Sequence, residues 1–548
     1  MDRNPEQDRR LLWAFVLTMA VMFLWQKFFL PKPPPAEPAA VTAEAPSATP
    51  TAASTAAPAT PAVAEQVIPR REVSVQAPGW IGKLSSTGGA INQVTLNDYQ
   101  TEPTVTPIWI WVWDKVRGEA DGGWVPYQGG GTPAVLLDHE TALGIAGVGA
   151  PGVDVDYLIE EAGGATVAHR VLPGGVEITK RYTPGDKPGQ MLLEVSFKNS
   201  GPTPVDGVWV GVSQYAHKKA SRFDNAVMPV GYADGDLHTL EEPSDVLGSA
   251  AKVTEEGPVQ WFGLANRYFL SVLLPETPAD LRLVFDDLGN DHTGAFAVDG
   301  RALNPGETRT LKFSTYLGPK DLGILEQTGQ DLDDAVEFGF FGFFSKILLF
   351  LLEVFQKGVV SWGLSIILLT VLVKALFYPL TQKSYVSGRR MQQLQPQMNE
   401  LKEKYKDDPT KQQQEMMKLF SANDVNPLGG CLPTLVQMPI WFGLYSCLSY
   451  SVELYNSRFL YLQDLTAADP YAVLPTVVAV LFYAQQAMTP MTGMDPAQQK
   501  MMKAMPIVFA VFMYSLPSGL ALYITVNSVL SIAQMWLIKR TMPAPQAA

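Results

Sequence analysis

The chain has 548 residues, of which 47% are hydrophobic and 17% charged. Its mean hydropathy of +0.05 is high for a soluble protein and low for a bundle of membrane helices, which suggests two unlike parts. The net charge of −13 comes from residues 65–337, which hold 38 acidic and 20 basic side chains, while the remainder is slightly basic. This surplus of acid argues against nucleic acid as the main partner.

The N-terminal segment, residues 1–30, is expected to be a membrane anchor. Its apolar run, residues 11–30, is long enough to span a bilayer, and PKPPP follows it where a signal peptide would have a small-residue cleavage site. Arginines at positions 3, 9 and 10 place the N-terminus in the cytoplasm. Residues 31–64 are rich in Pro, Ala and Thr, so we expect a disordered linker.

Residues 65–330 are expected to form a large antiparallel β-sandwich. Short alternating runs such as VEITKRYT (176–183) and TLKFSTYLG (310–318) recur, with Gly and Pro between them. The orientation of the anchor places this domain outside the cytoplasm. Its one aromatic cluster, WIWVW (109–113) with Trp124, is explained by packing or a strand edge at least as well as by a sugar site.

The remainder is expected to be helical and membrane-bound. Residues 331–358 predict an amphipathic helix in the membrane interface, because the very apolar stretch there carries Lys346 and Glu353. A core at 359–540 follows, with apolar segments 362–380, 432–452, 471–488 and 505–538. LPSG at 516–519 divides the last of these. We therefore predict five core spans, six spans with the anchor, and a C-terminal tail at 541–548.

The loops between these spans set the orientation. Eight basic residues lie in 382–426, one in 453–469, two in 489–503 and two at 539–540. By the positive-inside rule, the first and third loops and the C-terminus are cytoplasmic, and the second loop lies outside.

Two cytoplasmic features are candidates for docking. Residues 383–422 have apolar side chains at three- and four-residue steps, interrupted by KDDPT at 406–410, which predicts a helical hairpin. The loop that follows the third core span holds six methionines between Met488 and Met505. Flexible thioethers suit varied apolar partners, although a solvated spacer and simple core filling are the alternatives.

Lys374 stands inside the apolar run 362–380. A lysine at mid-bilayer costs ~2.5–3.5 kcal/mol on insertion scales. The run ends about 9 Å further along the helix, so the side chain could snorkel to the interface. Thr370, Lys374 and Tyr378, however, are spaced at four-residue steps among apolar residues, which favours a polar stripe that faces a hydrated cavity.

Polar residues recur on other apolar helices. Tyr523, Asn527, Ser531 and Gln534 share one face of the last span, and the span 471–488 ends with Gln485 and Gln486. Such side chains normally point into the bundle. They predict a groove of hydroxyls, amides and one cation, with interhelical hydrogen bonding alone as the alternative.

No pattern of residues indicates covalent chemistry or a bound metal. The sequence has no nucleophile–base motif, no Gly-rich phosphate loop and no HExxH. Its five histidines are scattered, and Cys431 and Cys447 form no CxxC pattern. We therefore expect no enzyme activity, cofactor or metal site.

Long motifs run in order through the membrane half: YPLTQKSYVSGRRMQQLQP (378–396), NPLGGCLPTLVQMPIWFGLY (426–445), DPYAVLP (469–475), DPAQQKMMKAMP (495–506) and LPSGLALY (516–523). Together they closely resemble the YidC-type membrane protein insertases, which are related to the Oxa and Albino proteins. YLGPKDL (316–322) matches the end of that family's periplasmic domain. The rest of the β domain is matched by position and pattern more than by motif.

The resemblance implies a Gram-negative insertase of the bacterial inner membrane. Its five core helices would surround a hydrophilic groove that is closed outside and open to the cytoplasm and lipid, and its β domain looks like a sugar-binding fold. The implied partners are nascent membrane proteins, the Sec translocon, the ribosome or signal recognition machinery, and the lipid bilayer. No nucleic acid is implied apart from contact with the ribosome.

Site residues follow from the resemblance by position. The groove cation falls on Lys374, where the family usually has arginine; lysine keeps the charge but loses the planar fork. Thr370 and Gln486 match groove positions, and Trp441 and Phe512 match positions that touch the incoming segment. One further groove aromatic falls on Ser515, and Tyr514 is the candidate substitute. Tyr523, on the polar face of the last span, completes the set.

Two other functions stay open at this point. A solute transporter or channel could use Lys374 as an anion site, but it would predict inverted repeats, and none is evident in five spans. An envelope receptor for sugars would instead place the working site in the β domain.

Overall fold

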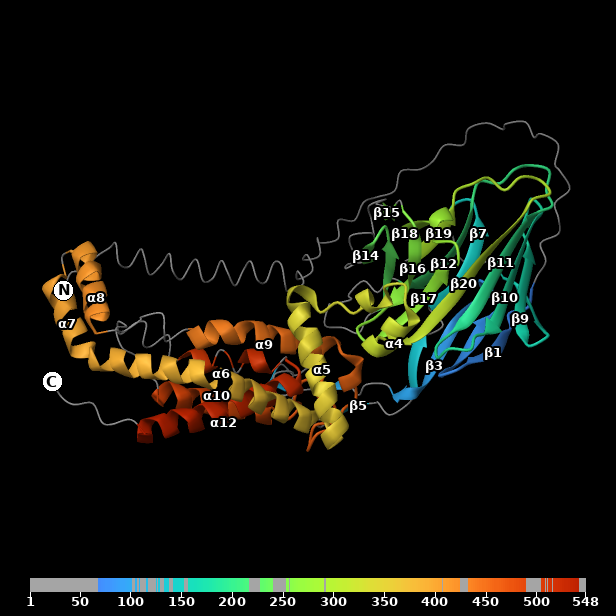
Figure 1. Cartoon of the computed structure of the whole chain (residues 1–548). Coiled ribbons are helices and arrows are strands. Elements are labelled where there is room, and N and C mark those ends of the chain that lie inside the picture. Colours follow the sequence, from blue (N-terminus) through green and yellow to red (C-terminus); the bar gives the residue numbers. More distant parts are fainter. Residues whose placement is uncertain are drawn as a thin grey trace.

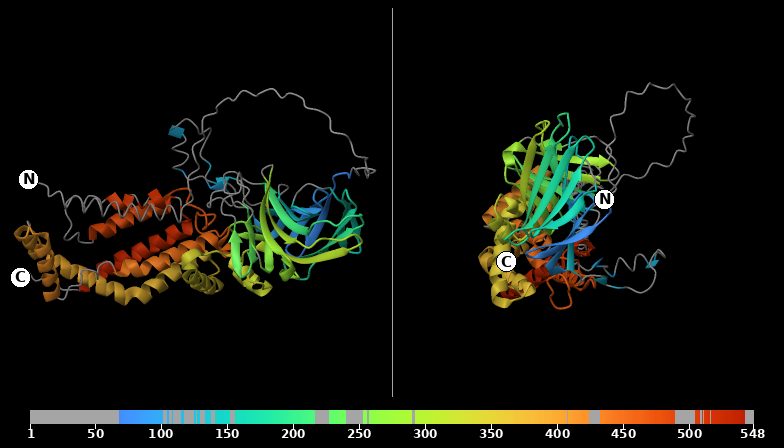
Figure 2. Two further views of the ribbon diagram at one scale, coloured as in Figure 1. Left: turned by 90° about the horizontal axis from the view of Figure 1, so that it is seen from above. Right: turned by 90° about the vertical axis from the view of Figure 1, so that its right-hand side faces the viewer.

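The computed structural model describes residues 68–100, 133–137, 141–151, 156–215, 227–239, 253–255, 257–289, 292–406, 408–423, 432–488 and 516–541, with isolated positions within 104–128 and 504–514 (Figure 1). The predicted anchor, the linker, WIWVW, the Met-rich loop and the tail from position 542 lie outside the described residues. A β domain and a helical part lie end to end, and the helical hairpin lies at the far end from the β domain (Figures 1 and 2).

Two nine-stranded antiparallel sheets make up the β domain. The first sheet consists of β1 (Glu72–Ala77), β2 (Trp80–Ser85), β3 (Ala90–Gln100), β7 (Thr141–Val148), β12 (Val208–Tyr215), β19 (His292–Asp299), β18 (Arg282–Gly289) and β15 (Val253–Glu255) in that order, with β6 (Pro133–Leu137) paired to β3. The second runs β14 (Asp236–Thr239), β13 (Met228–Ala233), β16 (Val259–Ala265), β17 (Phe269–Pro275), β20 (Thr308–Pro319), β11 (Met191–Asn199), β10 (Val176–Pro184), β9 (Ala165–Val171) and β8 (Leu158–Ala162). Two short strands, β4 (Thr104–Val105) and β5 (Tyr127–Gln128), pair separately, and η1 (Pro278–Asp280) precedes β18.

The predicted antiparallel β architecture is confirmed. Strand β11 alternates buried and exposed side chains along its length, as a half-buried strand does, because successive side chains point to opposite faces. Inward residues of both sheets share one apolar cluster, which includes Trp80, Val210, Phe197 and Phe313. Burial of this cluster supplies the main stabilisation of the domain.

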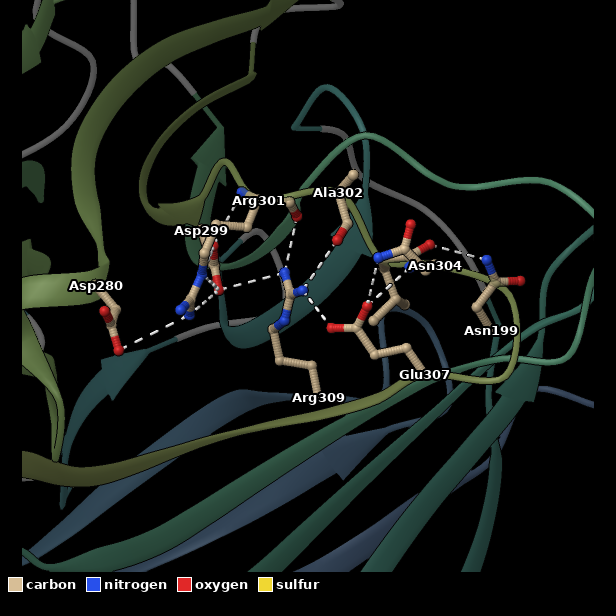
Figure 3. Close-up of polar contacts among 9 residues, drawn as sticks. Asn199, Asp280, Asp299, Arg301, Ala302, Asn304, Glu307 and Arg309 are labelled. Carbon is tan, nitrogen blue, oxygen red and sulfur yellow. Dashed lines mark hydrogen bonds and ion pairs between the residues drawn. The ribbon is translucent and has the colours of Figure 1, made fainter.

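A polar network closes the turn between β19 and β20 (Figure 3). The buried carboxylate of Asp299 accepts hydrogen bonds from Arg301, with Nη2 at 2.7 Å, and forms an ion pair with Arg309. Burial alone would raise the pKa of Asp299, but the hydrogen bonds and charges of the two arginines lower it below its usual value. Arg309 also contacts Glu307 at 2.5 Å, so each member of this network has partners.

A lysine, Lys180, lies entirely inside the β domain. Its ammonium nitrogen donates to the carbonyl oxygens of Gly88 at 2.5 Å and Gly144 at 2.8 Å, and lies 4.4 Å from the centre of the Tyr157 ring. Tyr182 donates to the carbonyl of Gly89 at 2.8 Å. Polar groups at this depth are stable only with such partners.

Short helices lead from the β domain into the helical part: α4 (Leu322–Thr328), η2 (Leu332–Ala335) and η3 (Gly339–Phe341). The helical part then comprises α5 (Gly342–Val359), α6 (Trp362–Gln393), α7 (Gln395–Lys404), α8 (Pro409–Ala422), α9 (Leu432–Tyr450), η5 (Val452–Leu454), α10 (Val473–Met488), the helix Ala504–Met513 and α12 (Ser518–Thr541). The helix Ala504–Met513 ends before Tyr514 and α12 begins at Ser518, so the predicted break at LPSG is confirmed.

Three helical segments of the described chain are long and apolar enough to cross a membrane: Gly339–Val359, Trp362–Gly388 and Ser518–Ile538. Val473–Met488 and Ala504–Met513 are shorter apolar helices. The six-span count therefore stays a prediction. The placement of α5 in the membrane interface also stays a prediction. Figure 1 shows α5 crosswise to α6 and α12, as expected for an interfacial helix.

The helical hairpin differs in one respect from the prediction. The first arm was expected as one continuous helix, but α6 continues through Pro379 to Gln393 and a new helix begins at Gln395. Pro396 explains the break, because proline lacks an amide proton and fits the first turn of a helix. The second break is as predicted: Asp408 accepts a hydrogen bond from the Lys411 amide at 3.0 Å and caps α8.

The loop between α9 and α10 joins the two parts. The Tyr455 ring lies 4.9 Å from Tyr268 and 5.5 Å from Phe269, both in the β domain. Asn456 donates its side-chain amide to the carbonyl of Gln100 at 2.8 Å, and Val452 belongs to the core of the β domain. The β domain therefore contacts the helices through this loop as well as through α4.

Candidate functional groove

Lys374 points from α6 toward α12. Its ammonium donates to the hydroxyl of Ser531 at 2.7 Å, and that hydroxyl donates to the carbonyl of Asn527 at 2.8 Å. Among the residues that the structure describes, no carboxylate lies within ion-pairing distance of Lys374. The lysine thus faces a neighbouring helix and keeps a charge that no described acid neutralises.

A second polar contact between the same helices lies further toward the hairpin, about two turns along α6 and about one turn along α12. The buried amide of Gln534 donates to the hydroxyl of Thr381 at 2.8 Å, and Thr381 donates to the carbonyl of Phe377 at 3.0 Å. Sequence analysis placed Gln534 on the polar face but did not single out Thr381, because Thr381 follows the end of the apolar run. The two contacts form a polar seam between α6 and α12.

The predicted stripe on α6 is only partly correct. Thr370 is fully buried and donates to the carbonyl of Ile366 at 2.6 Å, whereas Tyr378 is 38% exposed. Because a helix turns once per 3.6 residues, a spacing of eight residues rotates a side chain by about 80°. Thr370 and Lys374 therefore face inward, and Tyr378 does not.

Further polar residues come from α9, α10 and α12. The buried hydroxyl of Tyr523 accepts a hydrogen bond from Gln437 of α9, a residue that sequence analysis missed although it is a lone amide in an apolar run. Gln485 donates to the carbonyl of Ser528 at 3.1 Å, and the neighbouring Gln486 is half-buried. The buried oxygens Asn527 Oδ1 and Ser528 Oγ have no hydrogen-bond partner among the described residues.

Aromatic rings flank this polar region. Trp441 is half-buried, with its ring 4.8 Å from Phe442 and 6.4 Å from Phe509. Phe509 in turn lies 5.0 Å from Phe482 of α10. Phe512 is 46% exposed, and Tyr514 is half-buried at the turn before α12. An apolar surface therefore continues from the inward-facing polar groups to the outside of the helices.

No group of three or more His, Cys, Asp or Glu side chains in the described part of the chain could hold a metal ion. The region therefore combines one cation, amides and hydroxyls with a flanking set of rings. These groups can attract an acidic side chain and hydrogen-bond to a polar one, but they include no nucleophile–base pair.

Comparison with known proteins agrees with this architecture. Residues 354–545 match the family model described as 60Kd inner membrane protein, and residues 165–351 match the model described as YidC periplasmic domain. The boundary between the two matches falls within α5. The β domain is thus the periplasmic domain of this family.

Curated relatives match over nearly the whole chain. A membrane protein insertase YidC of Geobacter metallireducens is 34% identical over 558 residues, covering 98% of this chain and all of the relative. That of Geobacter sulfurreducens is 40% identical over 385 residues, covering 69% and 71% of the two chains. A solved active YidC insertase with its first transmembrane domain resolved aligns at 19% identity and a TM-score of 0.36, covering 85% and 92%. The identity and coverage of the two Geobacter relatives show that the chain belongs to the YidC family of membrane protein insertases.

Proposed function

We propose that this chain inserts proteins into the bacterial inner membrane through the polar groove formed by α6, α10 and α12. The main support for the proposal is that Lys374 faces α12 and has no acidic partner among the described residues. A carboxylate in the incoming segment would supply the missing countercharge. The transporter or channel alternative finds no support in the comparisons.

The mechanism is physical rather than chemical, with no nucleotide or cofactor. Polar and charged groups of a client meet a desolvation barrier in bare lipid, and the amides, hydroxyls and cation of the groove lower that barrier. Burial of about 20 apolar residues in lipid then drives insertion.

The apolar part of the client would leave past the ring surface. Trp441, Phe512 and Tyr514 connect the polar groove to the exposed side of the helices, where Ile507 and Val511 are also exposed. This arrangement supports an exit into lipid beside the helix Ala504–Met513. Thr370, Gln486 and Tyr523 would shape the inner wall of the groove rather than contact the client directly, since Thr370 and Tyr523 are buried and hydrogen-bonded.

The proposal includes the topology and the partners. Both termini would be cytoplasmic, with six spans, α5 in the interface, and domain limits at residues 30, 64, 330, 358 and 540. The hairpin 383–422 would receive a ribosome, signal recognition machinery or the Sec translocon. Its position at the opposite end from the β domain supports a cytoplasmic location (Figures 1 and 2).

Insertion into proteoliposomes tests the proposal. Purified protein is reconstituted, a short client with an acidic translocated tail is synthesised beside the vesicles, and protease protection of the tail is measured. We expect protection with the wild type and a loss of at least tenfold with Lys374→Ala. Lys374→Arg should retain protection, because the charge is kept.

Lys357→Ala is the matched control, since Lys357 is an exposed lysine in the last turn of α5, outside both the groove and the hairpin. It should insert as the wild type does. A client whose acidic residues are changed to amides should depend less on Lys374. Equal protection with Lys374→Ala and wild type would exclude the cation model, and protection no better than in empty vesicles would exclude insertion itself.

A further inference from the structure

We propose that the tip of the loop between α9 and α10, formed by Leu460 and Tyr461, docks in the lipid interface of the outer leaflet. This contact is separate from the groove; it rests on the proposed topology, which places the loop outside the cytoplasm, and not on the insertion mechanism. The tip would lie at the boundary between the phospholipid headgroups and the acyl chains. Four observations carry it: the geometry of the turn, the exposure of its apolar tip, its level on α6 and its rigid attachment.

The tip is a tight turn closed by two backbone hydrogen bonds. The Phe459 amide donates to the Leu462 carbonyl, and the Leu462 amide donates to the Phe459 carbonyl, each at 3.0 Å. Leu460 at its apex has φ of 53°, in the left-handed region. Glycine or asparagine adopts this conformation readily, whereas leucine does so only with strain.

The side chain of Leu460 does not offset that strain by packing against the described residues. The Leu460 side chain is 84% exposed, so it gains little from packing against the described chain. Tyr461 and Tyr471 beside it are 37% and 41% exposed, and their rings lie 5.8 Å apart. The Tyr461 hydroxyl donates to Asp469 at 2.8 Å, which fixes its ring. An apolar apex flanked by two tyrosines matches the aromatic belt of membrane proteins.

The level of the tip on the helices agrees with a lipid contact. Phe459 packs directly on Gly363, the second residue of α6, where an added Cβ would approach its ring to 2.2 Å. From this point α6 presents exposed Leu364, Leu368 and Leu372, which are 43%, 38% and 41% exposed. The tip therefore lies where the apolar surface of α6 begins, which is where a spanning helix enters the hydrocarbon.

The loop holds this position rigidly. The Leu465 amide donates to the Ser457 carbonyl at 3.1 Å, and the Ser518 and Gly519 amides donate to the carbonyls of Ala467 and Leu465 at 2.7 and 2.8 Å. These bonds attach the loop to the start of α12. Docking of the tip would thus fix the depth in the membrane of the outer end of α12.

Depth-dependent quenching tests the proposal with the full-length chain. A Cys431→Ser/Cys447→Ala background receives Leu460→Cys, is labelled with an environment-sensitive nitrobenzoxadiazole dye, and is reconstituted in phosphatidylglycerol/phosphatidylethanolamine vesicles. We expect blue-shifted emission and at least twofold stronger quenching by a nitroxide near the headgroups than by one near the bilayer centre. Glu161→Cys, in the β domain, is the aqueous control, and Leu372→Cys, on the exposed face of α6, is the deep control.

Two outcomes would overturn the proposal. In the first, the dye at position 460 emits at the same wavelength as the dye at position 161 and is quenched by aqueous iodide but not by the lipid nitroxides. The other comes from Leu460→Asn, which relieves backbone strain and removes the apolar side chain. In detergent this variant should melt at or above the wild-type temperature, and in lipid nanodiscs below it. The same change in both media would show that Leu460 does not bind lipid.

Discussion

Two lysines, one in each part of the molecule, lie among apolar residues without a carboxylate partner in the described chain. Lys180 in the β domain is completely buried and has two carbonyl acceptors and one aromatic ring. Lys374 between α6 and α12 is half-buried and has one hydroxyl acceptor. The first site is complete within the fold, and the second leaves bonding capacity for another molecule.

The chemistry of Lys180 explains why its site is structural. Burial lowers the pKa of this amine well below its usual value of 10.5. Its nitrogen donates to the carbonyls of Gly88 and Gly144 and lies 4.4 Å from the centre of the Tyr157 ring. The side chain is 0% exposed, so no ligand can reach the nitrogen from solvent. Lys374 keeps donors in reserve, as attraction of a client carboxylate requires.

The largest predicted effect follows from Lys180→Met. Methionine fills a similar volume but removes the lysine donor from the buried carbonyls of Gly88 and Gly144, and leaves Gly144 only the Tyr182 hydroxyl at 3.3 Å. A buried group that loses its partner costs about 1–3 kcal/mol. We expect the free energy of unfolding of the β domain to fall by roughly 3 kcal/mol, measured by urea unfolding of the full chain in detergent. Lys198→Met is the matched control, because Lys198 is exposed and forms only a surface ion pair with Glu177.

The same substitution at Lys374 should have the opposite effects on stability and on insertion. Lys374→Met should leave the urea midpoint almost unchanged and abolish insertion of an acidic client, whereas folded Lys180→Met should insert normally. A large loss of stability at position 374, or a small one at position 180, would contradict the distinction between the two sites.

The sequence indicates that Lys180 is buried, but it does not indicate the acceptors of Lys180. Val176, Ile178, Lys180 and Tyr182 share one phase of the alternation in β10, so periodicity alone would turn Lys180 inward. Its acceptors could not be predicted, because Gly88 and Gly144 lie 92 and 36 positions away in the sequence. Contacts of that range depend on the packing of two sheets.

The polar seam between α6 and α12 shows the same limit. Lys374 and the polar face of the last span were identified from spacing, and the structure brings Ser531 of that face to Lys374. The rotation of Tyr378 away from this seam, the break of the first hairpin arm before Pro396 and the contact of Gln437 with Tyr523 were not predicted. Each depends on how helices turn, end or face one another in three dimensions, which local patterns record only approximately.

A smaller effect is expected at the contact between the two parts. Tyr455→Ala removes ring contacts with Tyr268 and Phe269, each worth about 0.5–1.5 kcal/mol. We expect roughly 2 kcal/mol less stability at this contact, seen in calorimetry as separate unfolding of the β domain and the helices. Tyr455→Phe keeps the ring and should retain a single transition. One unchanged transition with Tyr455→Ala would mean that the apolar cluster shared by the β domain and the helices couples the two parts without this ring.

The smallest effect is a pH dependence at the same contact. Glu453, in η5, has one carboxylate oxygen that is buried without a hydrogen-bond partner among the described residues. Burial raises its pKa from 4.5 to about 7; Asp321 and Glu353 add to this increase, while hydrogen bonds from its own amide and that of Leu322 oppose it. The folded protein therefore binds this proton more tightly than the unfolded chain does.

The sign of the pH effect follows from that difference. The stabilising contribution of protonated Glu453 is complete below pH 4.5 and is lost as the pH rises through about 7. Glu453→Gln keeps the neutral form at every pH, so it should melt with the wild type at pH 5 and a few degrees above it at pH 8. Glu326→Gln, on α4, is the control and should follow the wild type at both values. A Glu453→Gln variant that melts below the wild type at pH 8 would mean that the ionised carboxylate stabilises the contact, and that the two parts are joined by charge as well as by aromatic packing.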